Sequence, residues 1–180
     1  GWAVGGLLLL AFLRLEKRAA VWAAGRSLNG LLAYIAVSSV LLVGLVLGMQ
    51  ASLGAWQVPA QWAEQALAKT GAEIDPLNPE GAFTVGGTWL GLLGGAAWLA
   101  RRRGGLDTSG KPLQLVLRYL LGLVGVLVLW FGLGQVFPRG ADWVSYALRY
   151  FRYALIGAWI SALAPLLFVR LGWAKPMRQP

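Results

Sequence analysis

The sequence predicts an all-α protein: a polytopic transmembrane helical bundle with four full spans plus a truncated first span. Of its 180 residues, 58% are hydrophobic and 13% are charged, whereas a soluble domain usually carries about 25% charged residues. The apolar residues also gather in long uncharged windows, and a helix crosses a bilayer with about 20 such residues. These two observations argue against a soluble globular protein.

The first uncharged window, Gly1–Leu13, is too short to cross a membrane. As a helix it reaches only about 20 Å, against a hydrocarbon core of about 30 Å. We therefore expect residues 1–13 to be the last part of a transmembrane helix that begins before Gly1. Residues 14–180 are then expected to form a four-span membrane region.

Each later uncharged window is expected to hold one span, at residues 30–50, 82–100, 118–137 and 146–171. Between the first two of these spans, Pro59 suits the first turn of a helix and Gly71 its end. The pattern between them predicts a short amphipathic helix at about 59–70 that lies on the outer membrane surface. Near the last span, Asp142 is expected to cap the helix and Pro165 to kink it.

The positive charges predict the orientation. Most of the sixteen lysines and arginines lie in three segments: directly after the first window, between the second and third full spans, and in the carboxyl-terminal tail. With alternating spans, these three segments lie on the same side of the membrane. By the positive-inside rule, we expect an integral protein of a bacterial cytoplasmic membrane with a cytoplasmic carboxyl terminus. The formal net charge is +9, but it is divided among loops beside the membrane. Attraction to anionic lipids explains it better than nucleic-acid binding.

The composition leaves little for catalysis, because the chain contains no cysteine and no histidine. This removes thiolate nucleophiles, zinc–thiolate sites and the commonest general base. We expect no catalytic residue, no metal site and no cofactor. The carboxylates between Asp75 and Glu80 could bind a cation, but a solvated loop is the favoured interpretation.

Glycines recur at a spacing of four residues in two of the predicted spans, which places them on one helix face. They are expected to allow close packing of helices: Gly44, Gly48, Gly87, Gly91 and Gly95. The sequence leaves open whether the partner helix belongs to this chain or to another.

The segment Gly105–Pro112 nearly matches the phosphate-binding loop of nucleotide-binding proteins. Pro112 stands where that loop needs a hydroxyl to bind Mg²⁺, and the segment follows a predicted membrane helix where the loop follows a strand. We favour a turn, with Ser109 near the start of the next helix.

The strongest candidate for ligand contact lies at the start of the last predicted helix. Helical spacing places Arg149 and Arg152 one turn apart, with Tyr146 and Tyr150 beside them. Two arginines at the level of the lipid headgroups would suit a lipid phosphate or another phosphate. The alternative, which we weight more heavily, is that the arginines only anchor the helix at the membrane interface.

The helix start Gly1-Trp2-Ala3-Val4-Gly5-Gly6 resembles the segment after the last catalytic motif of bacterial type 2 phosphatidic acid phosphatases. Later stretches resemble a carboxyl-terminal membrane extension of some members: Arg118–Gly122, Leu148–Leu155 and Ala164–Phe168. The resemblance implies a lipid-phosphate phosphatase that needs no metal, uses a covalent phosphohistidine and has its active site outside. The family's signatures, including Pro-Ser-Gly-His, are absent here, so no residue of this chain inherits a catalytic role.

Two hypotheses follow from the sequence. In the first, the chain is the membrane-embedded carboxyl-terminal part of a lipid-phosphate phosphatase-like protein and is non-catalytic by itself. In the second, it is a non-catalytic integral membrane subunit or scaffold that packs within a larger membrane complex. Membrane lipids are the expected partners under both hypotheses. Other membrane subunits are additional expected partners under the second hypothesis, and nucleic acid is expected under neither.

Overall fold

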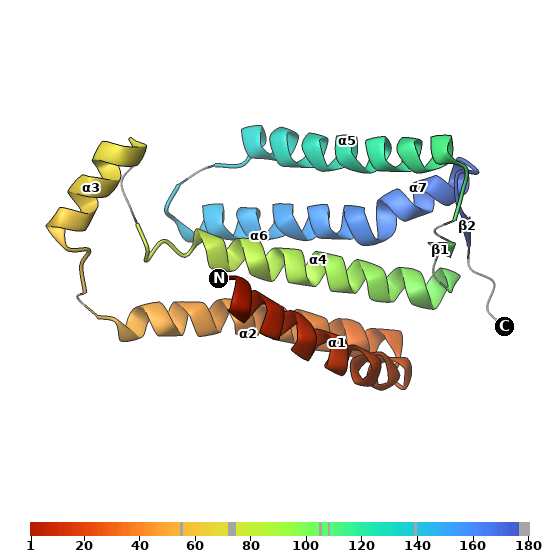
Figure 1. Ribbon diagram of the computed structural model, residues 1–180, viewed down its shortest axis with the longest axis horizontal. Helices are drawn as coiled ribbons and strands as arrows, with labels where there is room; N and C mark the ends of the chain where they lie inside the picture. The colour runs from red at the N-terminus through yellow and green to blue at the C-terminus, as the bar shows by residue number, and fades with distance from the viewer. Residues whose placement is uncertain (55, 72–74, 105, 108, 139, 177–180) are drawn as a thin grey trace.

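The computed structural model describes residues 1–54, 56–71, 75–104, 106–107, 109–138 and 140–176 (Figure 1). Nearly all regular structure is helical. In chain order the elements are α1 (Trp2–Ala24), α2 (Leu28–Ser52), α3 (Ala60–Thr70), α4 (Glu80–Arg103), β1 (Leu106–Asp107), α5 (Pro112–Val136), α6 (Trp143–Ala158), η1 (Trp159–Leu163), α7 (Ala164–Arg170) and β2 (Lys175–Pro176).

Four helical stretches among the described residues are long and apolar enough to cross a membrane: α2, α4, α5, and α6 with η1 and α7 as one stretch. They run in alternating directions through the bundle (Figure 1). The predicted all-α bundle with four full spans is therefore confirmed. The helices extend beyond several predicted ends, because charged or polar residues at a membrane boundary end the apolar window without ending the helix.

Helix α4 occupies the centre of the bundle and packs against α2 on one side and α6 on the other. Helix α5 packs on α6 and α7, away from α2 (Figure 1). The α2 side of the core consists of Leu31, Ile35 and Val43, which are 8%, 5% and 8% exposed. Large apolar side chains cover the outside of α5, as expected for a surface that faces lipid.

The last span contains a π-helical turn, η1, which ends two residues before Pro165. In this turn the amide of Ala164 donates to the carbonyl of Trp159, five residues earlier. Proline has no amide hydrogen and its ring disturbs the preceding turn, so a wider turn accommodates it. The predicted disturbance at Pro165 is present, and the helix changes direction between α6 and α7 (Figure 1).

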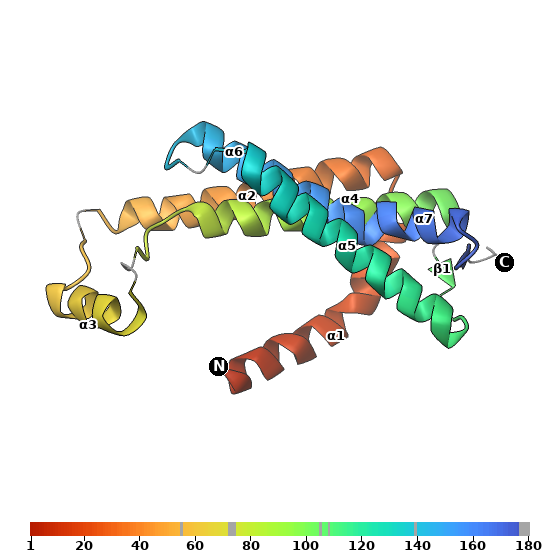
Figure 2. The ribbon, with the colours of Figure 1, turned by 90° about the horizontal axis from the view of Figure 1, so that it is seen from above.

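Helices α1 and α3 lie at the edges of the bundle. Helix α1 continues past Arg14 and ends before Gly25, and none of its residues is buried. Its amino-terminal half points away from the other helices (Figure 2). Helix α3 follows Pro59 and ends at Gly71, whose φ of +69° suits glycine. The predicted boundary of the first span at Leu13 stays a prediction, since a helix can leave a bilayer without ending.

At the end of the bundle opposite α3, β1 and β2 form a short antiparallel clip. Leu106 pairs with Pro176, and Asp107 pairs with Lys175. The side chain of Arg118 in α5 donates to the carbonyls of Ser109 and Trp173. The loop after α4 is thereby tied to the segment after α7.

Candidate functional site

The site begins at the amino terminus of α6, which lies at the α3 end of the bundle. Asp142 caps this helix, as predicted: its Oδ1 accepts from the amides of Val144 and Ser145, both at 3.0 Å. Its Oδ2 lies 2.7 Å from the hydroxyl of Ser145, which donates to it. The Ser145 hydroxyl and these amides hold the pKa of Asp142 below its ordinary value. The first turn of α6 is thus firmly positioned.

Arg149 points from α6 to the start of α4. Its Nη2 lies 2.5 Å from Oε2 of Glu80, and the two side chains are 26% and 34% exposed. The sequence placed Arg149 in an anion-binding pair but did not identify a carboxylate beside it. Part of its charge is therefore compensated within the chain.

The two tyrosines of the predicted group contact other helices. The ring of Tyr146 stacks on Phe83 of α4, with centroids 5.2 Å apart and an angle of 12° between the rings. The hydroxyl of Tyr150 lies 2.7 Å from the Oγ of Ser39 in α2. Their observed contacts are packing and hydrogen bonding between helices.

Arg152 differs from the other three predicted site residues in having a buried nitrogen that makes no hydrogen bond to the described residues. This nitrogen is Nε of its guanidinium group. Its guanidinium carbon lies 5.2 Å from the ring centroid of Tyr153. A buried donor without an acceptor costs about 1–3 kcal/mol, so the position favours an incoming oxygen atom.

Arg152 and Arg149 line one small cavity together with Glu80, Phe137, Pro138 and Gly140. Its volume is about 40 Å³, and a single water needs about 10–15 Å³ on this measure. The cavity can therefore hold a small polar group, such as oxygen atoms of a phosphate. We call Arg149, Arg152 and this cavity the arginine corner.

The position of α6 depends on close contact with α4. A Cβ on Gly87 would overlap the carbonyl oxygen of Tyr150, and one on Gly91 would overlap the carbonyl oxygen of Ala154. At Gly95 a Cβ would overlap the hydroxyl of Ser161. The glycine face of α4 thus meets a helix of the same chain, and this contact places Arg149 beside Glu80.

Gly44 and Gly48 have different surroundings. A Cβ on either residue would find no described atom within 4 Å. These glycines do not contact another helix within the described part of the chain. Their predicted packing role stays a prediction and would require a partner from outside these residues.

The segment that resembles a phosphate-binding loop contains the β1 strand and a turn. The amide of Ser109 donates to Oδ1 of Asp107 at 2.9 Å, and α5 begins at Pro112. The amide of Lys111 donates to Oε1 of Gln114 at 3.1 Å. The side-chain contact at the start of this helix therefore comes from Gln114 and not from Ser109. Residues 105 and 108 lie outside the described part.

In the described part of the acidic stretch before α4, no group of three or more Asp and Glu residues is placed to hold a metal ion. Glu80 pairs with Arg149, and Oδ1 of Asn78 accepts from the amide of Glu80 at 2.9 Å. Residues 72–74 lie outside the described part of this stretch.

Comparison with protein families gives a match over the second half of the chain. A family model described as "PAP2 superfamily phosphatase, transmembrane extension" matches residues 83–176. The chain belongs to this family. The match runs from α4 to β2, so it includes the glycine face of α4, the arginines of α6 and the clip of this PAP2 transmembrane extension. Searches among curated proteins and among solved structures give no match.

Proposed function

We propose that this chain is the non-catalytic membrane extension of a phosphatase that acts on lipid phosphates. The match to the PAP2 transmembrane extension is the observation that supports this proposal most directly. The chain contains no histidine, and the phosphatases that it resembles use a phosphohistidine. The histidines of the reaction would thus come from outside these 180 residues.

The proposal includes an orientation. Arg101, Arg102, Arg103, Lys111 and Lys175 lie at the clip end of the bundle, whereas Glu80 and Asp142 lie at the α3 end. The positive-inside rule favours a cytoplasmic clip end and carboxyl terminus in a bacterial cytoplasmic membrane. The arginine corner then faces outward, on the side where the resembled phosphatases have their active site.

Within this extension, the arginine corner is proposed to contact the phosphate of a lipid. Arg152 provides the leading contact because its buried Nε has no acceptor among the described residues. Arg149 provides a second guanidinium at the same cavity, although Glu80 shares it. Guanidinium groups suit phosphate oxygens because they offer several donors in one plane.

The experiment uses the purified chain in lipid nanodiscs that contain phosphatidic acid. We expect no release of inorganic phosphate above that of empty nanodiscs; release above that level would contradict the non-catalytic assignment. Replacing Arg152→Gln should weaken phosphatidic acid binding, while Arg103→Gln, at the opposite end of the bundle, should not. Equal binding by both variants would reject the arginine corner as a phosphate site.

A second function is favoured by the open glycine face of α2. Because Gly44 and Gly48 have no described neighbour within 4 Å of a Cβ, they could receive a helix of another subunit, and the chain would act as a scaffold in a larger membrane complex. Gly44→Ile/Gly48→Ile should then abolish co-purification of that subunit from native membranes. This second function would be rejected if the variant co-purified the subunit as well as the wild type does, or if no subunit co-purified with the wild type.

A further inference from the structure

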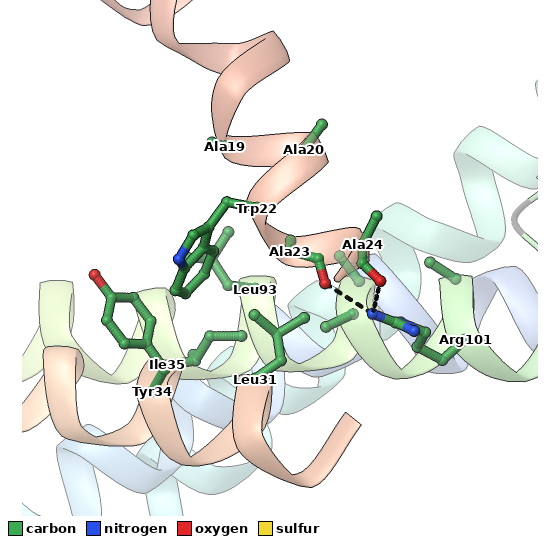
Figure 3. A pocket seen from close by; sticks show the side chains of 13 residues that line it. Ala19, Ala20, Trp22, Ala23, Ala24, Leu31, Tyr34, Ile35, Leu93 and Arg101 are labelled. Carbon is green, nitrogen blue, oxygen red and sulfur yellow. Dashed lines mark hydrogen bonds between the residues drawn. The ribbon is translucent and has the colours of Figure 1, made fainter. Parts of the chain in front are cut away.

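A large apolar pocket lies between α1, α2 and α4 (Figure 3). It is near the clip end of the bundle, where α2 begins and α4 ends (Figure 1). Its volume is about 650 Å³, which falls within the range of about 300–1,000 Å³ typical of ligand pockets. Leu31 and Ile35 of α2 and Leu93 of α4 line it, with Trp22 of α1 opposite them (Figure 3).

Small side chains keep this pocket open. The last turns of α1 and α4 contribute mainly alanines to its walls, Ala23 and Ala97 among them. Helix α1 has no buried residue and therefore does not close on α2 and α4. Walls of this kind accept a hydrocarbon chain, because apolar surface gains free energy when it leaves water and has no polar group to satisfy.

Two arginines lie at or next to the pocket: Arg101 lines it, and Arg26 stacks on its Trp22. Nη2 of Arg101 donates to the carbonyls of Ala23, Ala24 and Arg26 at 2.7, 3.0 and 2.5 Å, as Figure 3 shows for the first two. The guanidinium carbon of Arg26 lies 4.6 Å from the ring centroid of Trp22.

The charges of Arg26 and Arg101 are not neutralised by these contacts, because carbonyl groups and indole rings carry no net charge. In the described part of the chain, neither arginine forms an ion pair with a carboxylate; the ion pair found there joins Arg149 to Glu80. One cation, Arg101, therefore lines the apolar pocket, and a second, Arg26, stacks on Trp22 of its wall. An anion is the complementary group for this pair.

We propose that this pocket binds one anionic phospholipid, with an acyl chain along the apolar walls and the headgroup phosphate against Arg26 and Arg101. Basic pockets between transmembrane helices are suited to anionic headgroups. The site lies at the opposite end of the bundle from the arginine corner. It goes beyond the proposed function and does not depend on it.

The bound lipid would also fix the position of α1. This helix is held to α4 by the hydrogen bonds of Arg101, and a lipid chain in the pocket would add apolar contact between α1, α2 and α4. Lipid binding and ordering of α1 should thus strengthen each other.

The experiment measures lipids retained by the purified chain, using native mass spectrometry with phosphatidylglycerol and phosphatidylcholine. We expect the wild type to retain phosphatidylglycerol preferentially, and Arg26→Gln/Arg101→Gln to lose affinity by roughly fivefold per arginine. The matched control Arg102→Gln/Arg103→Gln removes the same charge at the same end and should retain the preference. Equal losses in both double variants would overturn the proposal, as would no preference in the wild type.

A second variant tests the apolar part of the site without changing charge. Ala97→Trp should fill the pocket and lower retention of the lipid, and Ala20→Trp serves the same purpose from α1 should the first variant fail to fold. Glycerol phosphate, which has no acyl chain, should not displace the lipid. Displacement of the lipid by glycerol phosphate, or unchanged lipid retention in the filled variants, would overturn the proposal. It would also be overturned if the wild type formed a dimer through this pocket and the filled variants dissociated that dimer without losing lipid.

Discussion

The hydroxyl of Ser39 in α2 lies 2.7 Å from the hydroxyl of Tyr150 in α6. Ser39 is 0% exposed, and its Oγ also donates to the carbonyl of Gly86 in α4 at 2.6 Å. Because a serine has a single hydroxyl hydrogen, Tyr150 must be the donor to Ser39. One small polar group therefore links three spans.

We expect Ser39→Ala to lower the free energy of unfolding by about 1–2 kcal/mol, and Tyr150→Phe by about 0.6 kcal/mol, since hydrogen bonds between membrane helices contribute modestly. The double variant should lose less than the sum, because both changes remove one shared contact. Unfolding by dodecyl sulfate in mixed micelles measures these values. Ser52→Ala is the control, because the Ser52 hydroxyl donates to the carbonyl of Met49 in its own helix. Additive losses in the double variant would contradict the proposed link between the helices.

The glycine face of α4 predicts a contrast between two glycine substitutions. A Cβ on Gly91 would overlap the carbonyl of Ala154, whereas one on Gly44 meets no described atom within 4 Å. We expect Gly91→Ala to cost about 3 kcal/mol because the helix backbones must separate. Gly44→Ala should be neutral or stabilising by up to about 1 kcal/mol. Thermal unfolding in the same detergent compares them, and similar effects would show that α4 and α6 do not pack as described.

The cap of α6 predicts a dependence on pH. Folding lowers the pKa of Asp142, mainly through its hydrogen bond with Ser145. A lowered pKa means that this carboxylate stabilises the fold above its unfolded-state pKa and that the stabilisation is lost as the pH falls through the folded-state pKa. Asp142→Asn keeps an acceptor for the cap but should show less loss of stability in acid. An unchanged slope of stability against pH between the wild type and Asp142→Asn would contradict this role.

The contact of η1 with α5 can be tested at Trp159. Its indole Nε1 donates to the carbonyl of Gly122 at 3.0 Å, and a Cβ on Gly125 would overlap the indole ring. Trp159→Phe should cost about 1 kcal/mol through the lost hydrogen bond. Trp130→Phe is the matched control, because its indole makes an exposed and longer contact of 3.4 Å with Tyr153. If both variants unfold at the same midpoint, the η1 contact does not stabilise the bundle.

The arginine corner predicts a gain of binding. Glu80 competes with any anion for Arg149, so Glu80→Gln should strengthen phosphatidic acid binding by up to about fivefold, the value of a partly exposed ion pair. Glu64→Gln removes an equal charge from α3 and serves as the control. The lipid bound per protein in nanodiscs is the measurement, and weaker binding in Glu80→Gln would indicate that Glu80 holds Arg149 in its binding position.

The spans could be predicted because each physical signal is local. An uncharged window is read directly from the residues, and so are the cap at Asp142 and the distortion before Pro165. The ends of α1 and α5 were less predictable: α1 continues through Arg14 because the charged segment after it is rich in good helix formers. Similarly, α5 begins at Pro112, before the predicted span, since proline suits a first turn.

The contacts of the site were not predictable, because they join residues far apart in the chain. The pairing of Glu80 with Arg149 needs the packing of α4 on α6, which the glycines of α4 permit but do not identify. The contact of Ser39 with other helices could have been predicted but was not. A polar residue in an apolar span usually faces another helix. The pocket beside Arg101 depends on the angle of α1, which no spacing of residues encodes.

The clip between β1 and β2 has a consequence for the order in which the protein is assembled. Its two strands flank the last two spans, and β2 is made after all of them. The pairing, with the hydrogen bond from Arg118 to the carbonyl of Trp173, can form only when the segment after α7 lies on the same side of the membrane as the loop after α4. The clip thus joins the two ends of the last helical hairpin, so a chain in which only one of these two spans has crossed the membrane cannot close it.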